Sequence, residues 1–231
     1  MNCLEKTVMY VIIVAAGSGW RMSSDIPKQF LELCGKPILM YAIEAFVDAF
    51  EDIKTIVVLP QSHFTYWDKL CVRYNFNVPH QTVEGGSQRF HSVKNGLALI
   101  RDDDGLVAIH DGARPLVSRE TIINCFNEAE KFGNAVPVTV PVDSFREAGS
   151  EKSRMLDRST LRMVQTPQVF KIALIKNAYE QRYQQAFTDD SSVFEAAGNK
   201  VHLTEGNSEN LKITTTHDFI IAEALLQAHK T

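Results

Sequence analysis

Closely spaced cysteines are missing from this sequence. Its four cysteines, Cys3, Cys34, Cys71 and Cys125, are scattered along 231 residues without a C-x-x-C pair. This pattern fits the reduced thiols of a cytoplasmic protein better than a disulfide framework or a zinc site. The seven histidines also show no ligand spacing such as H-x-x-x-H. We therefore expect neither disulfides nor a structural metal.

Long hydrophobic runs and an excess of basic residues are missing too. No apolar stretch is long enough to span a bilayer. The chain has 24 Lys and Arg against 28 Asp and Glu, and the net charge of −4 argues against non-specific binding to nucleic acid. We therefore expect no membrane and no nucleic acid among its partners.

The commonest phosphate-binding signatures are absent as well. A Walker A motif ends in Gly-Lys-Ser/Thr, whereas Gly35 and Lys36 are followed by Pro37. The dinucleotide-binding fingerprint needs a third glycine where this chain has Met22. A G-x-S-x-G motif is also missing, which argues against a serine hydrolase.

What remains is the composition of one globular domain, with 45% hydrophobic and 23% charged residues. Buried strands are expected at residues 11–14, 53–59, 78–84, 106–109, 135–140, 200–204 and 211–214. Helices are expected at residues 37–50, 62–74, 87–100 (capped by Ser87), 118–132 (capped by Ser118), 170–187, 190–197 and 217–229. This alternation predicts a Rossmann-like α/β fold, in which a mostly parallel sheet carries helices on both faces.

The first strand leads into a glycine-rich loop. Val11–Val14 is followed by the small residues Ala15, Ala16, Gly17, Ser18 and Gly19, and then by Arg21 and Lys28. Successive backbone N–H groups in such a loop form a nest for anions, and the two cations would add to it. Taken alone, the pattern fits a tight turn equally well.

Two further loops are expected at strand ends, at residues 85–89 and 110–115. Because ligands of such sheets bind beyond the carboxyl ends of the strands, we expect all three loops to meet at one crevice. Asp111 suits a carboxylate presented to Mg²⁺, and Arg114 offers a planar fork for a phosphate. Alternatively, Asp111 caps the turn and Arg114 pairs with it.

Residues 143–163 interrupt the alternation of strands and helices. They are polar and charged, with five cations and little apolar periodicity. From spacing alone they fit a solvated loop or hairpin, and the alternative is an arm that projects onto another subunit.

Five motifs, taken together and in order, resemble a known family. They are A-A-G-x-G-x-R-M-x(5)-K-Q-F from Ala15, G-G-x-x-R-x-x-S-V from Gly85, H-D-G-A-R-P from His110, T-P-Q from Thr166 and L-K-I-T from Leu211. The chain is similar along essentially its whole length to the 2-C-methyl-D-erythritol 4-phosphate cytidylyltransferase family. The resemblance implies a single nucleotidyltransferase domain over residues 1–231 that joins CTP to a polyol phosphate and releases pyrophosphate, with Mg²⁺.

The resemblance also implies roles for individual residues. The loop around the CTP triphosphate and ribose would consist of Ala15, Ala16, Gly17 and Gly19. Cytosine and its sugar would be recognised by Gly85, Gly86 and Ser92. The charge on the α-phosphate would be stabilised by Arg21 and Lys28. Asp111 would bind Mg²⁺, and Arg114 would bind substrate.

The resemblance gives residues 143–163 the role of a dimerisation arm. In the family this arm embraces the neighbouring subunit of a homodimer, where the positions of Ser144 and Arg158 help to complete the partner's substrate site. Arg158 and Lys212 match residues that hold the phosphate of methylerythritol phosphate for attack. Ser87 departs from the family pattern, because an acidic residue is common at its position.

Two other functions stay open at this point. A ribitol-5-phosphate cytidylyltransferase would share the scaffold, although such relatives tend to have A-G-G after the first strand, where this chain has Ala15-Ala16-Gly17. A non-catalytic nucleotide-binding module is the other alternative. An enzyme is favoured, because binding alone would not need the whole set of Arg21, Lys28, Asp111, Arg158 and Lys212.

Overall fold

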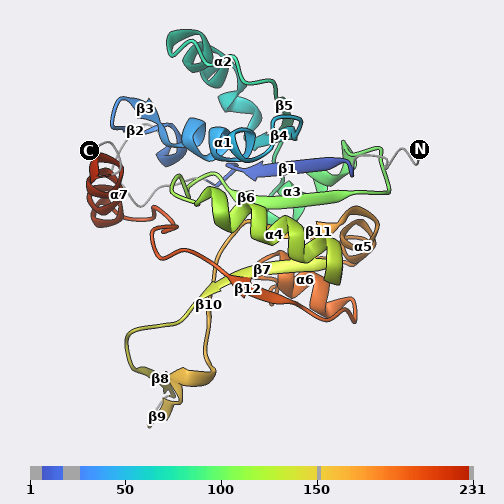
Figure 1. Ribbon diagram of the computed structural model, residues 1–231, viewed down its shortest axis with the longest axis vertical. Coiled ribbons are helices and arrows are strands. Elements are labelled where there is room, and N and C mark those ends of the chain that lie inside the picture. The colour runs from blue at the N-terminus through green and yellow to red at the C-terminus, as the bar shows by residue number, and fades with distance from the viewer. Residues whose placement is uncertain (1–6, 18–26, 150–151, 229–231) are drawn as a thin grey trace, which may run out of the picture.

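The computed structural model describes residues 7–17, 27–149 and 152–228. Within them, an eight-stranded sheet forms the centre of the molecule (Figure 1). Its strands follow the order β10 (Met163–Val164), β7 (Asn134–Thr139), β11 (Gln168–Lys171), β6 (Leu106–Asp111), β1 (Met9–Val14), β4 (Lys54–Leu59) and β5 (Gln81–Glu84), and β12 (Leu203–Glu205) pairs with β7.

The middle of this sheet is parallel, as the sequence predicts. β1 pairs in parallel with β4 and β6, and its Val11 lies opposite Thr55 on one side and Ala108 on the other. β4 pairs in parallel with β5. β11 runs antiparallel to both β6 and β7, so one reversed strand interrupts the sheet.

Helices cover both faces of the sheet. The helices are α1 (Ile38–Ala49), α2 (Phe64–Arg73), α3 (Arg89–Ala98), α4 (Arg119–Phe132), α5 (Ile172–Ala178), α6 (Asp190–Ala196) and α7 (Thr216–Ala228). Val11 and Ile13 of β1 pack with α1, α2 and α4, whereas Ile12 packs with α3, α5 and α6. Successive strand residues face opposite sides, so an unbroken apolar run such as β1 must be buried on both. The predicted fold class is confirmed.

Several smaller features lie outside the main sheet. Short 3-10 helices are η2 (Lys28–Phe30), η3 (Gln61–His63) and η4 (Arg158–Thr160), and β2 (Glu32–Leu33) pairs with β3 (Lys36–Pro37). α7 contacts β2 and packs its Ala222 into a separate apolar cluster. In the described part of the chain, no helix is long and apolar enough to cross a bilayer.

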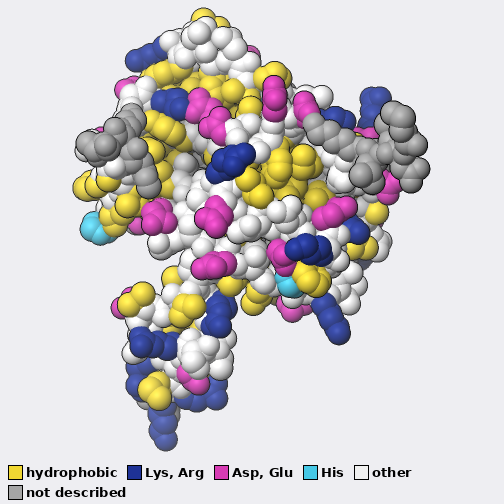
Figure 2. All heavy atoms as spheres, viewed as in Figure 1, with side chains coloured by type: hydrophobic (Ala, Val, Ile, Leu, Met, Phe, Trp, Pro, Cys, Tyr) yellow, Lys and Arg dark blue, Asp and Glu magenta, His cyan; other side chains and the backbone are white. Residues whose placement is uncertain are grey.

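Residues 143–149 and 152–163 project away from the sheet (Figure 1). Their centre is a hairpin of β8 (Phe145–Ala148) and β9 (Ser153–Leu156), and η4 follows it. Apolar residues of this segment and its base are exposed, including Val142 (82%) and Met155 (72%). Figure 2 shows these projecting residues as a mixture of apolar and basic side chains. The segment therefore has the shape expected of an arm.

The helix starts test two predicted caps. Ser118 is the cap of α4, where its Oγ accepts a hydrogen bond from the backbone N–H of Thr121 at 3.1 Å. The Ser87 prediction is wrong, because Gln88 occupies the cap position of α3 and no side chain caps it. Ser87 Oγ instead lies 3.1 Å from His91 Nδ1. A helix that starts one residue later leaves Ser87 outside the cap position.

Two predicted elements near the C-terminal end are wrong. Residues 170–187 do not form one helix, because β11 continues through Lys171 and α5 covers only Ile172–Ala178. Val169 and Phe170 of β11 are buried on opposite faces of the sheet, and a short apolar run of this kind fits a strand as well as a helix. Residues 211–214 form no strand, and Ile213 makes a backbone hydrogen bond to Ala113 instead.

His110 near the end of β6 is a fully buried histidine. Its Nε2 lies 3.0 Å from the backbone oxygen of Arg114, and its Nδ1 lies 3.1 Å from Thr166 Oγ1. Burial lowers its pKa to about 4, so the ring is neutral near pH 7. Because a carbonyl only accepts, Nε2–H donates to Arg114 and Nδ1 accepts from Thr166, whose Oγ1 in turn accepts from the Asp111 N–H at 3.1 Å.

This buried histidine predicts a loss of stability in mild acid. Unfolded His110 takes up a proton below its ordinary pKa of 6.5, whereas the folded ring resists protonation down to about 4. The free energy of unfolding should therefore fall by about 3 kcal/mol as the pH is lowered through this window. Urea unfolding at several pH values measures this loss. His110→Asn should flatten the slope, the exposed His217→Asn should not, and equal slopes for all three proteins would contradict the assignment.

Candidate active site

A cavity of about 410 Å³ opens beyond the carboxyl ends of β1 and β6. It is lined by residues in or next to all three loops that the sequence singled out and by one later residue, Lys212: Val14, Ala15, Ala16, Gly17, Lys28, Gln29, Gly86, Ser87, Gln88, Arg89, Ser92, Asp111, Ala113 and Lys212. The predicted meeting of these loops is confirmed. The expected residues Gly19 and Arg21 lie outside the described part of the chain.

The loop after β1 is held to its neighbours by its backbone. The Ala15 N–H donates to the Val58 oxygen at 2.9 Å, and the buried Gln29 side chain donates to the Ala15 oxygen at 2.9 Å. Beside them, a Cβ atom added to Gly17 would meet no atom of the described residues within 4 Å. Packing against the described part of the chain therefore does not require glycine at this position, which lines the cavity.

The two glycines after β5 are required by packing. A Cβ on Gly85 would lie 2.3 Å from the Cβ of Ala16, and one on Gly86 would lie 2.2 Å from the Cβ of His91. The Gly86 N–H donates to Ser92 Oγ at 3.1 Å. Ser92 is buried and also donates to the Gln88 oxygen at 3.2 Å, so this side chain fixes the turn between β5 and α3.

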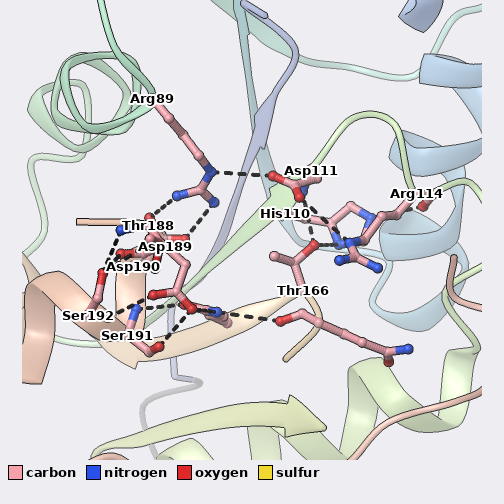
Figure 3. Close-up of polar contacts among 12 residues, drawn as sticks. Arg89, His110, Asp111, Arg114, Thr166, Thr188, Asp189, Asp190, Ser191 and Ser192 are labelled. Atoms are coloured by element: carbon pink, nitrogen blue, oxygen red, sulfur yellow. Dashed lines mark hydrogen bonds and ion pairs between the residues drawn. The ribbon is translucent and has the colours of Figure 1, made fainter. Parts of the chain in front are cut away.

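Asp111 is the last residue of β6 and lies among three cations, two of which, Arg89 and Arg114, are seen on either side of it in Figure 3. Its Oδ2 is 2.9 Å from Lys212 Nζ and 3.6 Å from Arg114 Nε, and its Oδ1 is 3.4 Å from Arg89 Nε. Burial favours the neutral acid, but Arg89, Lys212 and Arg114 outweigh it and hold the pKa of Asp111 well below its ordinary value. The carboxylate is therefore ionised throughout the physiological range.

Arg114 takes part in this cluster and also supports the chain near Lys212. Its guanidinium donates to the Asn210 oxygen at 2.6 Å, and its backbone N–H donates to the Asp111 oxygen at 3.0 Å. The expected pairing of Asp111 with Arg114 is thus present, together with two cations that the simple turn does not account for. Asn210 is itself buried and donates to the Thr166 oxygen at 2.7 Å, which ties this loop to the residues before β11.

Arg89 is the main site residue that the sequence reasoning did not assign. It is the first residue of α3, and it forms a two-pronged ion pair with Asp190 at 2.8 and 2.7 Å. Asp190 also accepts a hydrogen bond from Tyr179 Oη at 2.6 Å. The arginine of the G-G-x-x-R motif was the available signal. Its acidic partner lies 101 residues later, so spacing could not reveal the pair.

The residues that the sequence analysis assigned to the acceptor phosphate do not all lie at the cavity. Lys212 lines the cavity, whereas the arm residues Ser144 and Arg158 do not. Both arm residues are exposed, and the Arg158 guanidinium donates to the backbone oxygen of Val142. Within one chain the structure therefore brings together Lys28, Asp111, Arg114 and Lys212, but not the arm.

The donor set of the cavity limits how a metal could be held. Among the described residues, no group of three His, Cys, Asp or Glu side chains could bind a metal ion. Asp111 offers one ionised carboxylate at the cavity wall. Mg²⁺ typically takes one or two protein carboxylates together with water and substrate phosphates. The described residues therefore fit a magnesium ion that arrives with a phosphorylated ligand.

Comparisons with known proteins show the family to which the chain belongs. The family model for 2-C-methyl-D-erythritol 4-phosphate cytidylyltransferase (IspD) matches residues 9–228. Enzymes of that name from Phocaeicola vulgatus and Bacteroides thetaiotaomicron are each 49% identical, covering 94% of this chain and 99% and 98% of those chains.

Solved structures show the same fold. The 4-diphosphocytidyl-2C-methyl-D-erythritol synthase from Anaerococcus prevotii has a TM-score of 0.81 at 27% identity and covers 96% of this chain and 99% of its own. The 2-C-methyl-D-erythritol 4-phosphate cytidylyltransferase from Thermus thermophilus has a TM-score of 0.72 at 30% identity, covering 96% and 100%. The chain therefore belongs to the 2-C-methyl-D-erythritol 4-phosphate cytidylyltransferase family.

Proposed function

We propose that this nucleotidyltransferase joins CTP to 2-C-methyl-D-erythritol 4-phosphate in the non-mevalonate route to isoprenoid precursors. An oxygen of the acceptor phosphate attacks the α-phosphorus of CTP, and the bond from that phosphorus to the β-phosphate oxygen breaks. The products are the CDP-linked alcohol and pyrophosphate. The observation that carries this proposal is the meeting of Lys28, Arg89, Asp111 and Lys212 at one cavity, because such a transfer depends on positioning and charge neutralisation.

CTP is proposed to bind across the first two loops. Ala15, Ala16 and Gly17, with Gly19, would surround the triphosphate and ribose, and the space that the described residues leave at Gly17 supports a close approach of backbone to ligand. Gly86 and Ser92, with Gly85, would form the cytosine side. That turn is uncharged and tightly packed, and its fixed backbone groups suit hydrogen bonding to one small base.

We assign to Lys28 and Arg21 the stabilisation of negative charge on the reacting phosphates. Lys28 lines the cavity at the start of η2, where the buried Phe30 anchors the short helix. Asp111 would hold Mg²⁺, which when bound neutralises charge on the phosphates. Lys212 and Arg114 flank Asp111 and would help to bind the acceptor, with Lys212 exposed enough to reach its phosphate.

The arm is proposed to complete the site of a second subunit in a homodimer. Its exposed apolar residues include Val140, Val142, Phe145 and Met155, and the Arg158 side chain lies outside its own chain's cavity. Burial of these apolar groups would favour association. Ser144 and Arg158 would then contact the partner's acceptor. The free thiols of Cys34, Cys71 and Cys125 fit a reducing, cytoplasmic compartment.

The choice of acceptor is tested by pyrophosphate release from CTP and Mg²⁺. We expect turnover with 2-C-methyl-D-erythritol 4-phosphate to exceed that with ribitol 5-phosphate by at least about 10²-fold, since a site built to hydrogen-bond the hydroxyl groups of one acceptor rejects an acceptor that leaves its polar groups unpaired. If pyrophosphate were released with ribitol 5-phosphate but not with 2-C-methyl-D-erythritol 4-phosphate, ribitol 5-phosphate would be the acceptor. If neither compound led to release of pyrophosphate, the protein would be a non-catalytic nucleotide-binding module.

Lys28→Ala should lower kcat by about 10²–10³-fold and raise the KM for CTP much less. The reason is that the ammonium matters most as negative charge develops on the departing pyrophosphate. Steady-state kinetics with varied CTP separate the two constants. Lys131→Ala, on the exposed surface of α4, is the matched control. A raised KM for CTP with an unchanged kcat would show that Lys28 only binds CTP.

Arg158→Ala should abolish most activity, yet mixing it with Lys28→Ala subunits should restore about a quarter of the wild-type rate. In a mixed dimer one site receives intact Lys28 and the partner's intact Arg158, and random mixing makes half of the dimers mixed. Arg154→Ala, a change at another exposed arm arginine, should stay active alone. Verified mixed dimers without recovered activity would show that the arm does not serve the neighbouring site.

A further inference from the structure

The Arg89–Asp190 pair links the cavity to a region that does not line it. Arg89 borders the cavity, whereas Asp190 at the start of α6 is fully buried and Tyr179, just after α5, is 1% exposed. Both oxygens of Asp190 are bound by the Arg89 fork, and Tyr179 donates to one of them. The Tyr179 ring stacks on Phe90, with centroids 4.8 Å apart. The Arg89 guanidinium is thus held by Asp190 at the start of α6, and Asp190 is held in turn by Tyr179 just after α5.

This anchor decides which part of Arg89 can reach Asp111. Both terminal nitrogens are committed to Asp190, so only Nε faces Asp111, at 3.4 Å from Oδ1 (Figure 3). The second oxygen, Oδ2, is the one that faces Lys212 and Arg114. The two oxygens of Asp111 therefore have different neighbours, one fixed by a buried structure and one next to an exposed lysine.

From this geometry we propose that Arg89 is a positioning residue for Asp111, held by Asp190 and Tyr179, and that this relay fixes the orientation in which Asp111 presents Oδ2, now paired with Lys212, to the metal–nucleotide complex. The proposal rests on the assignment of Mg²⁺ and CTP to this cavity. An Arg89 released from Asp190 would have its full fork free for Asp111. A two-pronged pair would then engage both oxygens of Asp111, the only carboxylate among the described residues that line the cavity.

The energetics favour a relay over a chance contact. Asp190 is buried as an ion, and burial of a charge is costly unless it is fully paired and hydrogen-bonded. The Arg89 fork and the Tyr179 hydroxyl supply this pairing. Residues that hold a metal-binding carboxylate in place typically change metal affinity by about 10–100-fold when they are mutated.

The test uses variants that leave every cavity-lining side chain in place. Asp190→Asn should weaken Mg²⁺-dependent CTP binding about tenfold, and Tyr179→Phe should weaken it less, about two- to threefold. Binding of CTP without Mg²⁺ should stay within about twofold in both, since Lys28 and the glycine loops are unchanged. Isothermal titration calorimetry without acceptor measures each affinity, and circular dichroism checks the fold.

Glu180→Gln is the matched control, because Glu180 adjoins Tyr179 and pairs with Lys94 of α3 but is exposed. It should bind CTP as the wild type does, with and without Mg²⁺. A folded Asp190→Asn protein with unchanged Mg²⁺ dependence would overturn the relay. If that variant does not fold, unchanged Mg²⁺ dependence in Tyr179→Phe would overturn it. Failure of the proposed function is distinct, because wild-type protein would then show no Mg²⁺-dependent CTP binding or no transfer.

Discussion

The ionised carboxylate of Asp111 is the group around which the site is built. It is 8% exposed, and its charge is stable only because Arg89, Arg114 and Lys212 surround it. These three cations come from α3, from the turn after β6 and from the segment before α7. A buried charge with three partners from distant segments constrains all of them at once. The Asp111 carboxylate thus contacts cations from the N-terminal and C-terminal halves of the chain, and it also lines the cavity.

The parallel sheet makes this convergence possible. β1, β5 and β6 end at the same edge, so the loops after them share one crevice without any need for closeness in sequence. Close packing then sets the shape of that crevice. Gly85 lies so near Ala16 that no side chain fits between the second and first loops, and Ser92 holds the intervening turn. The contacts that fix the backbone of these loops therefore also set the shape of the cavity.

Much of the fold could be predicted from the residues. The apolar run of β1 requires burial on both faces, and the side chain of Ser118 caps α4 as its position indicates. Prediction failed where a local pattern fits two structures. Val169 and Phe170 are compatible with a helix until the sheet supplies neighbours on both sides. Ser87 has the right chemistry for a cap, but α3 starts one residue beyond the position that it could cap.

By itself the sequence determined the α/β class and the loops at the strand ends, and it singled out Lys28, Asp111, Arg114 and Lys212 as candidate site residues. These follow from periodicity, from glycine and charge at fixed spacings and from the family motifs. Only the tertiary structure decided that Arg89 pairs with Asp190, that His110 is buried and neutral, and that Arg158 lies outside its own chain's cavity. Ion pairing and burial depend on distance in space. Residues 89 and 190 become neighbours only when α3 and α6 pack on the same face of the sheet.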